Sequence, residues 1–287
     1  MTSEVIAGAI ASDLAFPAIF DWEAAYSNRR ASPEVHQWLT KAAEAAAAFG
    51  ASFKFDLDRD IVFGPSHRER LDIFHTESKP KGTLVFIHGG YWRASAKESH
   101  WHFAKGPLSA GWRVAFVEYP LCPQVSIRQI CQSIKRAVEY IAAALPEDRL
   151  VVSGHSAGGH LATWLGSDLS GLDQAVMHRI DRVVSYSGLH DLRPLVGAAQ
   201  LNADLRLDLH EARQLSPALS SPAGDFELIC IAGEKELPEF RRQNVLQANL
   251  WNGLGLRTRA IEIAQANHYT LLDGLCSPDS SITALLG

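Results

Sequence analysis

The stretch LVVSGHSAGGHLA, residues 150–162, joins an apolar run to a glycine-rich turn and then to a helical pattern. The run 150–152 is typical of a strand that is buried on both faces of a sheet. A helix is expected to begin near Gly159. Between them Ser156 stands in the spacing Gly-X-Ser-X-Gly, in which the glycines at 154 and 158 permit a turn too sharp for side chains. The stretch therefore predicts a strand, a sharp turn that presents a serine hydroxyl above the sheet, and a helix.

The same strand pattern recurs on both sides of this stretch, with helical patterns between the strands, for example at 127–145 and 160–168. A strand at 70–74 is expected to be half-buried, because its apolar and polar residues alternate. The other strands expected to be buried on both faces are 83–87, 112–117, 182–186, 227–231 and 259–263. Strands that alternate with helices predict an α/β fold with a mostly parallel, doubly wound sheet flanked by helices.

The length of 287 residues fits one large domain, and neither an internal repeat nor a linker composition divides the chain. We expect residues 1–20 to be an N-terminal extension and residues 21–287 to be a single domain. Residues 21–50 are expected to be helical, with a helix start at Ser32-Pro33-Glu34 and a glycine stop at Gly50. The least regular part, residues 189–224, is expected to form at most a small lid.

The composition narrows the class of protein. A net charge of -5 and an isoelectric point near 6.2 give no electrostatic case for binding nucleic acid or an anionic membrane. The N-terminus lacks the basic start of a signal peptide, and no apolar run approaches the roughly 18 residues that span a membrane. The four cysteines form no CxxC pattern and are typical of reduced side chains in a cytoplasmic protein. The expected partner is a small-molecule substrate, and both a monomer and a homodimer stay open.

A second glycine-rich loop, His-Gly-Gly-Tyr-Trp at 88–92, follows another expected buried strand. Acyl transfer develops negative charge on the carbonyl oxygen, which backbone N–H groups at a glycine loop can stabilise. A His-Gly-Gly loop after an early strand is a known form of such an oxyanion hole. The expected donors are the amides of Gly89, Gly90 and Ala157, with the Tyr91 amide as a substitute. Together with Ser156, this loop predicts nucleophilic catalysis.

A serine nucleophile of this kind needs a base late in the chain and an acid that orients the base. His268 follows the last expected strand, and no other histidine occurs after position 210. The acid should follow the preceding strand, where the loop supplies Glu234, Glu236 and Glu239. Spacing favours Glu236 slightly over Glu234, Glu239 begins an expected helix, and Asp191 is a weaker rival.

Five segments together resemble the kynurenine formamidase (arylformamidase) branch of the α/β-hydrolases, from about residue 21 to about residue 274. They are HGGYW at 88–92, EYPLCP at 118–123, GHSAGGHLA at 154–162, SGLHDLRPL at 187–195 and GEKELPEFRRQ at 233–243. The resemblance implies an α/β-hydrolase fold with Ser156 as nucleophile, Glu236 as acid and His268 as base. The acid of characterised formamidases is usually an aspartate before an X-Pro-Glu-Phe run, whereas this chain has a glutamate.

The resemblance further implies a metal-independent serine hydrolase that needs no cofactor and cleaves an aryl formamide, such as N-formylkynurenine, to formate and an arylamine. A short-chain carboxylesterase would use the same catalytic residues. A protein of another class, a non-catalytic ligand-binding scaffold, would be expected to have lost part of the site, which this chain retains. The pair His100 and His102 is not expected to bind a metal. Tyr91, Trp92 and Tyr186 are expected to line the substrate pocket, because they lie at or near strand ends.

Overall fold

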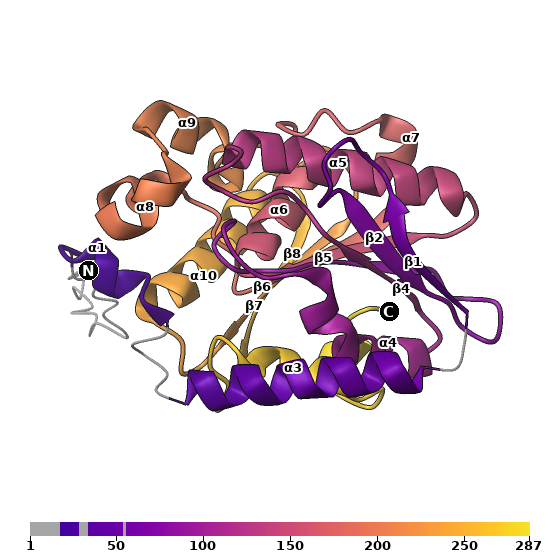
Figure 1. The fold of residues 1–287 in the computed structure, drawn as a ribbon. Helices are drawn as coiled ribbons and strands as arrows, with labels where there is room; N and C mark the ends of the chain where they lie inside the picture. The colour runs from indigo at the N-terminus through magenta and orange to yellow at the C-terminus, as the bar shows by residue number, and fades with distance from the viewer. Residues whose placement is uncertain (1–17, 29–33, 54–55) are drawn as a thin grey trace, which may run out of the picture.

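The computed structural model describes residues 18–28, 34–53 and 56–287, and the strands of these residues form one eight-stranded sheet (Figure 1). The strand order is β1-β2-β4-β3-β5-β6-β7-β8. The strands are β1 (Leu57–Val62), β2 (Arg70–Phe74), β3 (Thr83–Ile87), β4 (Arg113–Val117), β5 (Leu150–His155), β6 (Ile180–Tyr186), β7 (Glu227–Gly233) and β8 (Arg257–Ile263). Pairing is antiparallel at β1–β2 and β2–β4 and parallel from β4 through β8. The mostly parallel, doubly wound sheet predicted from the sequence is confirmed.

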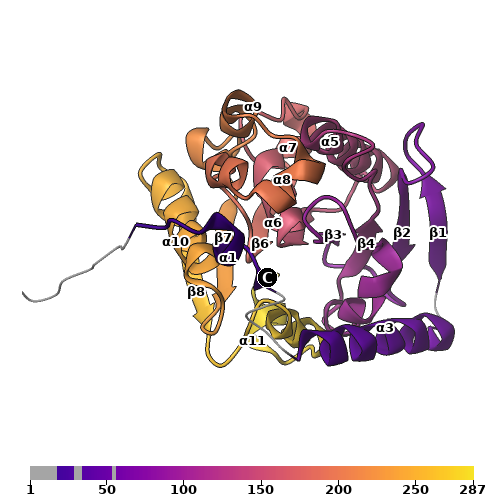
Figure 2. The ribbon, with the colours of Figure 1, turned by 60° about the vertical axis from the view of Figure 1, so that its left-hand side comes forward.

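Helices cover both faces of the sheet. The α-helices are α1 (Trp22–Ala25), α3 (Val35–Ser52), α4 (Lys105–Ser109), α5 (Ile127–Ala144), α6 (Ala157–Leu165), α7 (Gln174–Met177), α8 (Ala199–Leu205), α9 (Leu209–Gln214), α10 (Pro238–Asn252) and α11 (Ser281–Ala284). The 3-10 helices are η1 (Lys97–Ala104), η2 (Arg193–Gly197), η3 (Pro217–Leu219) and η4 (Thr270–Cys276). Figure 2 shows α5, α6 and α10 on one side of the sheet and α3 and α11 on the other.

Side chains of the central strands alternate between two hydrophobic clusters. Val85 and Ile87 of β3 join the cluster under α5, α6 and α10, whereas Leu84 and Phe86 join the cluster under α3, η1 and η4. All five residues of β3 are buried. Burial on both faces explains why the central strands read as continuous apolar runs in the sequence.

Two strands differ from expectation in their burial, and one was not predicted. The strand at 70–74 is almost fully buried rather than half-buried, because Leu71 and Ile73 pack into one hydrophobic cluster, Phe74 packs into the other, and polar Asp72 is buried in an ion pair with Lys97. The strand at the β8 edge is largely exposed rather than buried, because no strand covers its outer side. The polar strand β1, LDRDIV, carries no apolar period that would predict it.

The N-terminal helical region also differs from its prediction. Instead of one helical stretch over 21–50, the structure has the short helix α1 and the separate helix α3, which continues past Gly50 to Ser52. The predicted start residues 32 and 33, and residues 1–17 of the predicted extension, lie outside the described residues. Residues 189–224 fold into η2, α8, α9 and η3; α8 and α9 stand at the upper left of Figure 1. No helix among the described residues is long and apolar enough to cross a membrane.

One buried histidine ties α6 to the segment 189–224. His160 is fully buried, and its Nε2 lies 2.8 Å from the carbonyl oxygen of Leu215, to which it donates. Burial lowers the pKa of His160 to about 4, so the ring is neutral in the folded protein at neutral pH.

We therefore expect acid to destabilise the fold through His160. The unfolded histidine has a pKa of about 6.5, so the stabilisation is present above pH 6.5 and is lost as the pH falls towards 4. This one residue lowers the free energy of unfolding by about 2 kcal/mol between pH 7 and pH 5. Urea unfolding at pH 7, 6 and 5 measures the change. A free energy of unfolding that stays constant over this range would contradict the prediction.

Candidate active site

Ser156 lies in the turn between β5 and α6, where the sequence places it. Its backbone has φ 56° and ψ -117°, a strained conformation that is rare for a residue with a side chain. The Ser156 amide donates to the carbonyl of Tyr186 at the end of β6, at 2.7 Å. A Cβ atom at Gly158 would lie 2.0 Å from the Ile87 carbonyl oxygen, and one at Gly154 would lie 2.2 Å from the Gly158 carbonyl oxygen. Both glycines are therefore required by close backbone approach, as the turn pattern predicts.

His268 follows β8 and contacts the carboxylate of Glu236, which follows β7. The distance from His268 Nδ1 to Glu236 Oε2 is 2.8 Å, and both side chains are buried. Because Nδ1 donates to the carboxylate, Nε2 of the neutral ring carries the lone pair that a general base needs. His155 fixes the backbone at His268, since its Nε2 lies 2.7 Å from the His268 carbonyl oxygen. Phe240 packs edge-on against the His268 ring, with centroids 4.7 Å apart.

The second oxygen of Glu236 is held by two further donors. Glu236 Oε1 accepts from the Gly233 amide at 2.7 Å and from the hydroxyl of Ser187. These bonds fix the orientation of the carboxylate towards His268. Sequence reasoning did not single out Ser187. Its position just after β6, beside the nucleophile strand β5 in the sheet, is the signal that could have found it.

The rival acids have other partners. Glu234 Oε2 accepts from the Gln265 amide at 2.8 Å, and Asp191 pairs with Arg193. Glu239 accepts from Tyr26 and pairs with Arg242. Of the four candidate carboxylates, Glu236 is the one that the structure brings to His268.

The loop after β3 presses against the serine turn. A Cβ atom at Gly89 would lie 2.8 Å from the His155 carbonyl oxygen and 3.1 Å from Ser156 Cβ. Gly90 has φ 106°, which a side chain would strain. The amides of Gly89, Gly90 and Tyr91 make no hydrogen bond to any residue that the structure describes. The amide of Ala157, the first residue of α6, has no acceptor within its helix. Gly89 and Ala157 lie beside Ser156, and Gly90 and Tyr91 line the same cavity as Ser156.

The buried carboxylate of Glu118 contacts both ends of this loop. Glu118 Oε1 lies 3.1 Å from His88 Nε2, and Glu118 Oε2 accepts from the Lys97 amide at 3.0 Å. Burial alone would raise the pKa of Glu118, but the hydrogen bond and charge of His88 and the charge of Arg68 hold it below its ordinary value. Tyr119 adds a hydrogen bond from its hydroxyl to the His88 carbonyl, at 2.8 Å. Glu118 therefore fixes both ends of the loop that presents Gly89 and Gly90.

Ser156 and His268 line one cavity of about 650 Å³, together with residues from the N-terminal part of the chain. These N-terminal residues, which sequence reasoning did not assign to the site, are Tyr26, Ser27, Asn28, Trp38 and Leu39. His100 also lines the cavity, and the described residues hold no group of three His, Cys, Asp or Glu side chains arranged for a metal ion.

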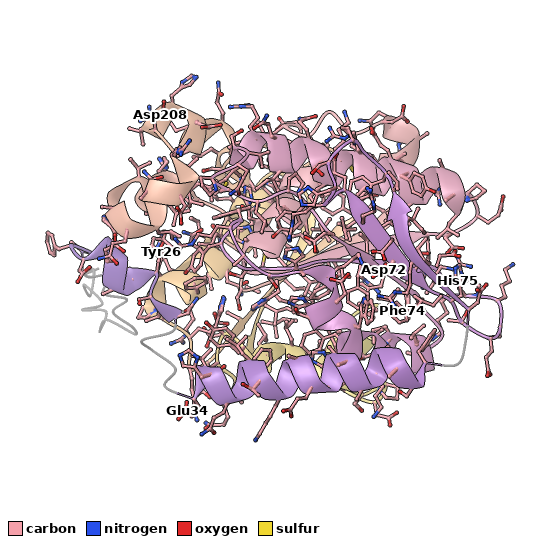
Figure 3. All side chains as sticks on the ribbon, in the orientation of Figure 1. Tyr26, Glu34, Asp72, Phe74, His75 and Asp208 are labelled. Atoms are coloured by element: carbon pink, nitrogen blue, oxygen red, sulfur yellow. The ribbon has the colours of Figure 1, made fainter. Side chains whose placement is uncertain are left out.

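Tyr26 fixes the N-terminal wall of the cavity. It is labelled in Figure 3, where the N-terminal segment meets α10. Its hydroxyl donates to Glu239 at 2.9 Å and accepts from Gln243 at 3.1 Å. Its carbonyl accepts from the hydroxyl of Tyr91.

Of the three aromatic side chains predicted to line the substrate pocket, two do not line this cavity. Tyr91 lines the cavity, but Trp92 and Tyr186 are completely buried and do not line it. Trp92 has φ 56° and packs edge-on against His160 in the core, at 5.2 Å. Tyr186 is the last residue of β6 and lies in the hydrophobic cluster on the α3 side of the sheet. Proximity to a strand end therefore does not predict which aromatic side chains line the cavity.

The sheet and the site together define the class of protein as an α/β-hydrolase: a mostly parallel sheet, a serine at a strained strand–helix turn, and a histidine–carboxylate pair at the same sheet edge. Within this class the chain belongs to the BD-FAE family, whose model matches residues 71–216. Kynurenine formamidase of Danio rerio is 25% identical over 236 residues, which cover 79% of this chain and 80% of that protein. The resemblance to the kynurenine formamidase branch is thereby confirmed.

Solved structures agree with this class. A provisionally named thioesterase from Silicibacter sp. TM1040 has a TM-score of 0.86 and 32% identity, covering 92% of this chain and 98% of that chain. The esterase from Pyrobaculum calidifontis has a TM-score of 0.68 at 16% identity, over 88% of this chain and 92% of that chain, and shares the fold. The chain is a hydrolase, as the sequence predicted.

Proposed function

We propose that the protein is a metal-independent serine hydrolase with Ser156 as nucleophile, His268 as general base and Glu236 as the acid that orients it. The observation that carries this proposal is the 2.8 Å contact between His268 Nδ1 and buried Glu236, in the cavity that Ser156 also lines. The amides of Gly89, Gly90 and Ala157 supply the oxyanion hole.

The chemistry follows from this arrangement. His268 Nε2 removes the hydroxyl proton as Ser156 Oγ attacks the substrate carbonyl carbon, and Glu236 stabilises the resulting imidazolium. The carbonyl oxygen becomes an oxyanion that accepts from the loop amides. As the intermediate collapses, His268 gives its proton to the leaving amine or alcohol, and an acyl-enzyme remains. Water, deprotonated by His268, then releases the carboxylic acid and restores Ser156.

The preferred substrate in this proposal is an aryl formamide of the N-formylkynurenine type, cleaved to formate and a free arylamine. This substrate is supported by two curated kynurenine formamidases, which align with this chain over about four fifths of their own length. The cavity volume of about 650 Å³ and the aromatic walls Trp38, Tyr91 and Tyr269 favour a large aromatic leaving group. The second candidate is hydrolysis of a short acyl ester or thioester, favoured by the 32% identity to the structure named as a thioesterase.

The deciding experiment compares kcat/KM for N-formyl-L-kynurenine, p-nitrophenyl acetate and a short acyl thioester, with a chelator present and the Ser156→Ala variant as background. We expect the formamide to be the best substrate, because its larger aromatic leaving group makes more contacts with the cavity walls than the p-nitrophenyl ring or a short thioester makes.

Fast ester or thioester cleavage with negligible formamide turnover would replace the formamide by the second candidate. Loss of activity with the chelator would contradict a metal-independent mechanism. Activity that persists in Ser156→Ala would remove Ser156 from the mechanism.

A further inference from the structure

The cavity carries one cation and one anion. Among the described residues that line it, Arg93 and Asp204 are the only formally charged side chains apart from histidines. Arg93 lies in the loop after β3 and Asp204 lies in α8, so the two charges come from separate elements of the chain. Arg93 Nη1 is 2.5 Å from Asp204 Oδ2.

This ion pair is easily replaced. The Arg93 and Asp204 side chains are 37% and 41% exposed, and ion pairs with this exposure contribute little to stability. A ligand with one carboxylate and one ammonium group can satisfy both partners when the pair opens. A ligand with a single charge leaves one partner without its counter-ion, and an uncharged ligand satisfies neither.

The remaining walls of the cavity are suited to an aromatic body. The rings of Trp38 and Tyr269 lie 5.6 Å apart at 46° and line the same cavity as Ser156. Trp38 is fixed by a hydrogen bond from its Nε1 to Asp273 at 3.3 Å. Aromatic rings in such an arrangement bind a further ring through offset or edge-to-face contacts.

We propose that Arg93 and Asp204 bind the carboxylate and the ammonium group of a zwitterionic amino acid carried by the leaving group, while Trp38 and Tyr269 contact its aromatic ring. This inference rests on the proposed function, since it assigns the leaving-group side of the same site. The two charge contacts and the scissile carbonyl at Ser156 fix three points, so the site distinguishes the two enantiomers of the amino acid.

The test first measures binding without any turnover. Calorimetry on Ser156→Ala gives the dissociation constants of L-kynurenine and of 2-aminoacetophenone, which has the same aromatic ketone without the amino acid. We expect L-kynurenine to bind about tenfold or more tightly, since hydrogen bonds to charged groups are worth this factor or more. Arg93→Met and Asp204→Asn, added singly, should each remove most of the difference. Equal binding of the two compounds before these substitutions would overturn the proposal.

A matched ion pair supplies the control. Arg149 and Asp181 are 3.0 Å apart, are each 41% exposed and do not line the cavity. Arg149→Met and Asp181→Asn should leave the difference between the two compounds unchanged. A similar loss in these variants would show a general effect of surface charge and overturn the assignment to Arg93 and Asp204.

Kinetics separate this inference from the proposed function. The Arg93→Met and Asp204→Asn variants should lose about tenfold in kcat/KM for N-formyl-L-kynurenine and lose discrimination against its D-enantiomer, whereas Arg149→Met and Asp181→Asn should change neither. If the unsubstituted enzyme cleaves no formamide but its Ser156→Ala variant binds L-kynurenine selectively, the formamidase proposal fails and the charged subsite stands. Rapid formamide cleavage without selective binding of L-kynurenine would support the formamidase proposal and overturn the charged subsite.

Discussion

Glu236→Gln is expected to lower kcat by about four orders of magnitude, whereas Glu234→Gln is expected to leave kcat within about twofold. Glutamine keeps the size of the side chain at 236 but removes the charge that stabilises the His268 imidazolium. Its amide can also donate to Nδ1, which favours the tautomer in which Nε2 carries the proton and no longer accepts one from Ser156.

Glu234 is a matched control because it lies two residues away, is exposed and has its hydrogen bonds with Gln265. The measurement is kcat for both variants on the best substrate of the wild-type enzyme, together with the rate at which a fluorophosphonate probe labels Ser156. Both rates should fall in Glu236→Gln and neither should fall in Glu234→Gln. Equal activity of the two variants, or the reverse order, would move the acid away from Glu236.

Gly158→Ala is expected to destabilise the fold by about 3 kcal/mol and to remove most activity. The added methyl group would meet the Ile87 carbonyl oxygen at 2.0 Å and the His88 carbonyl oxygen at 2.7 Å. Because both contacts are backbone atoms at the end of β3, either the start of α6 or the loop after β3 must move. The first movement displaces Ser156 and the second displaces Gly89 and Gly90, so stability and catalysis are lost together.

Gly253→Ala is the control for this substitution. Gly253 follows α10 with φ -63°, and a Cβ atom there would have its nearest neighbour at 3.4 Å, an ordinary contact. Its stability should stay within about 0.5 kcal/mol of the wild type. Thermal unfolding and kcat on the best substrate test both variants. A Gly158→Ala protein as stable and as active as Gly253→Ala would contradict the packing described for the serine turn.

Much of the fold followed from the sequence because the central strands are buried on both faces and therefore have an unbroken apolar pattern. The outer strands are less predictable: β1 is polar, and β8 carries charged side chains between its apolar ones, so its burial depends on whether a neighbour lies outside it. Which strand forms an edge is a property of the whole sheet. The local pattern therefore predicted that a strand exists at 259–263 but gave its burial incorrectly.

Candidate site residues were easier to predict where chain order restricts the choice. Ser156 has a turn motif, and His268 stands alone after the last strand. The choice between Glu234 and Glu236 depends on side-chain direction in one loop, which spacing resolves only weakly. The cavity walls depend on contacts between distant segments, such as that of Tyr26 with Glu239, and no local pattern in the sequence reports such a contact. For the same reason Trp92 was assigned to the wall and Trp38 was missed.

The N-terminal wall of the cavity has a consequence for how specificity can diverge in this family. Tyr26 and Trp38 precede the span 71–216 that defines membership, and His268 and Tyr269 follow it, yet all four face the space that the leaving group would occupy. Enzymes can therefore keep the serine turn, the glycine loop and His268 unchanged while exchanging the flanking residues that line the cavity, such as Tyr26, Trp38 and Tyr269. Relatives with the same central span should be grouped by these flanks when their substrates are compared.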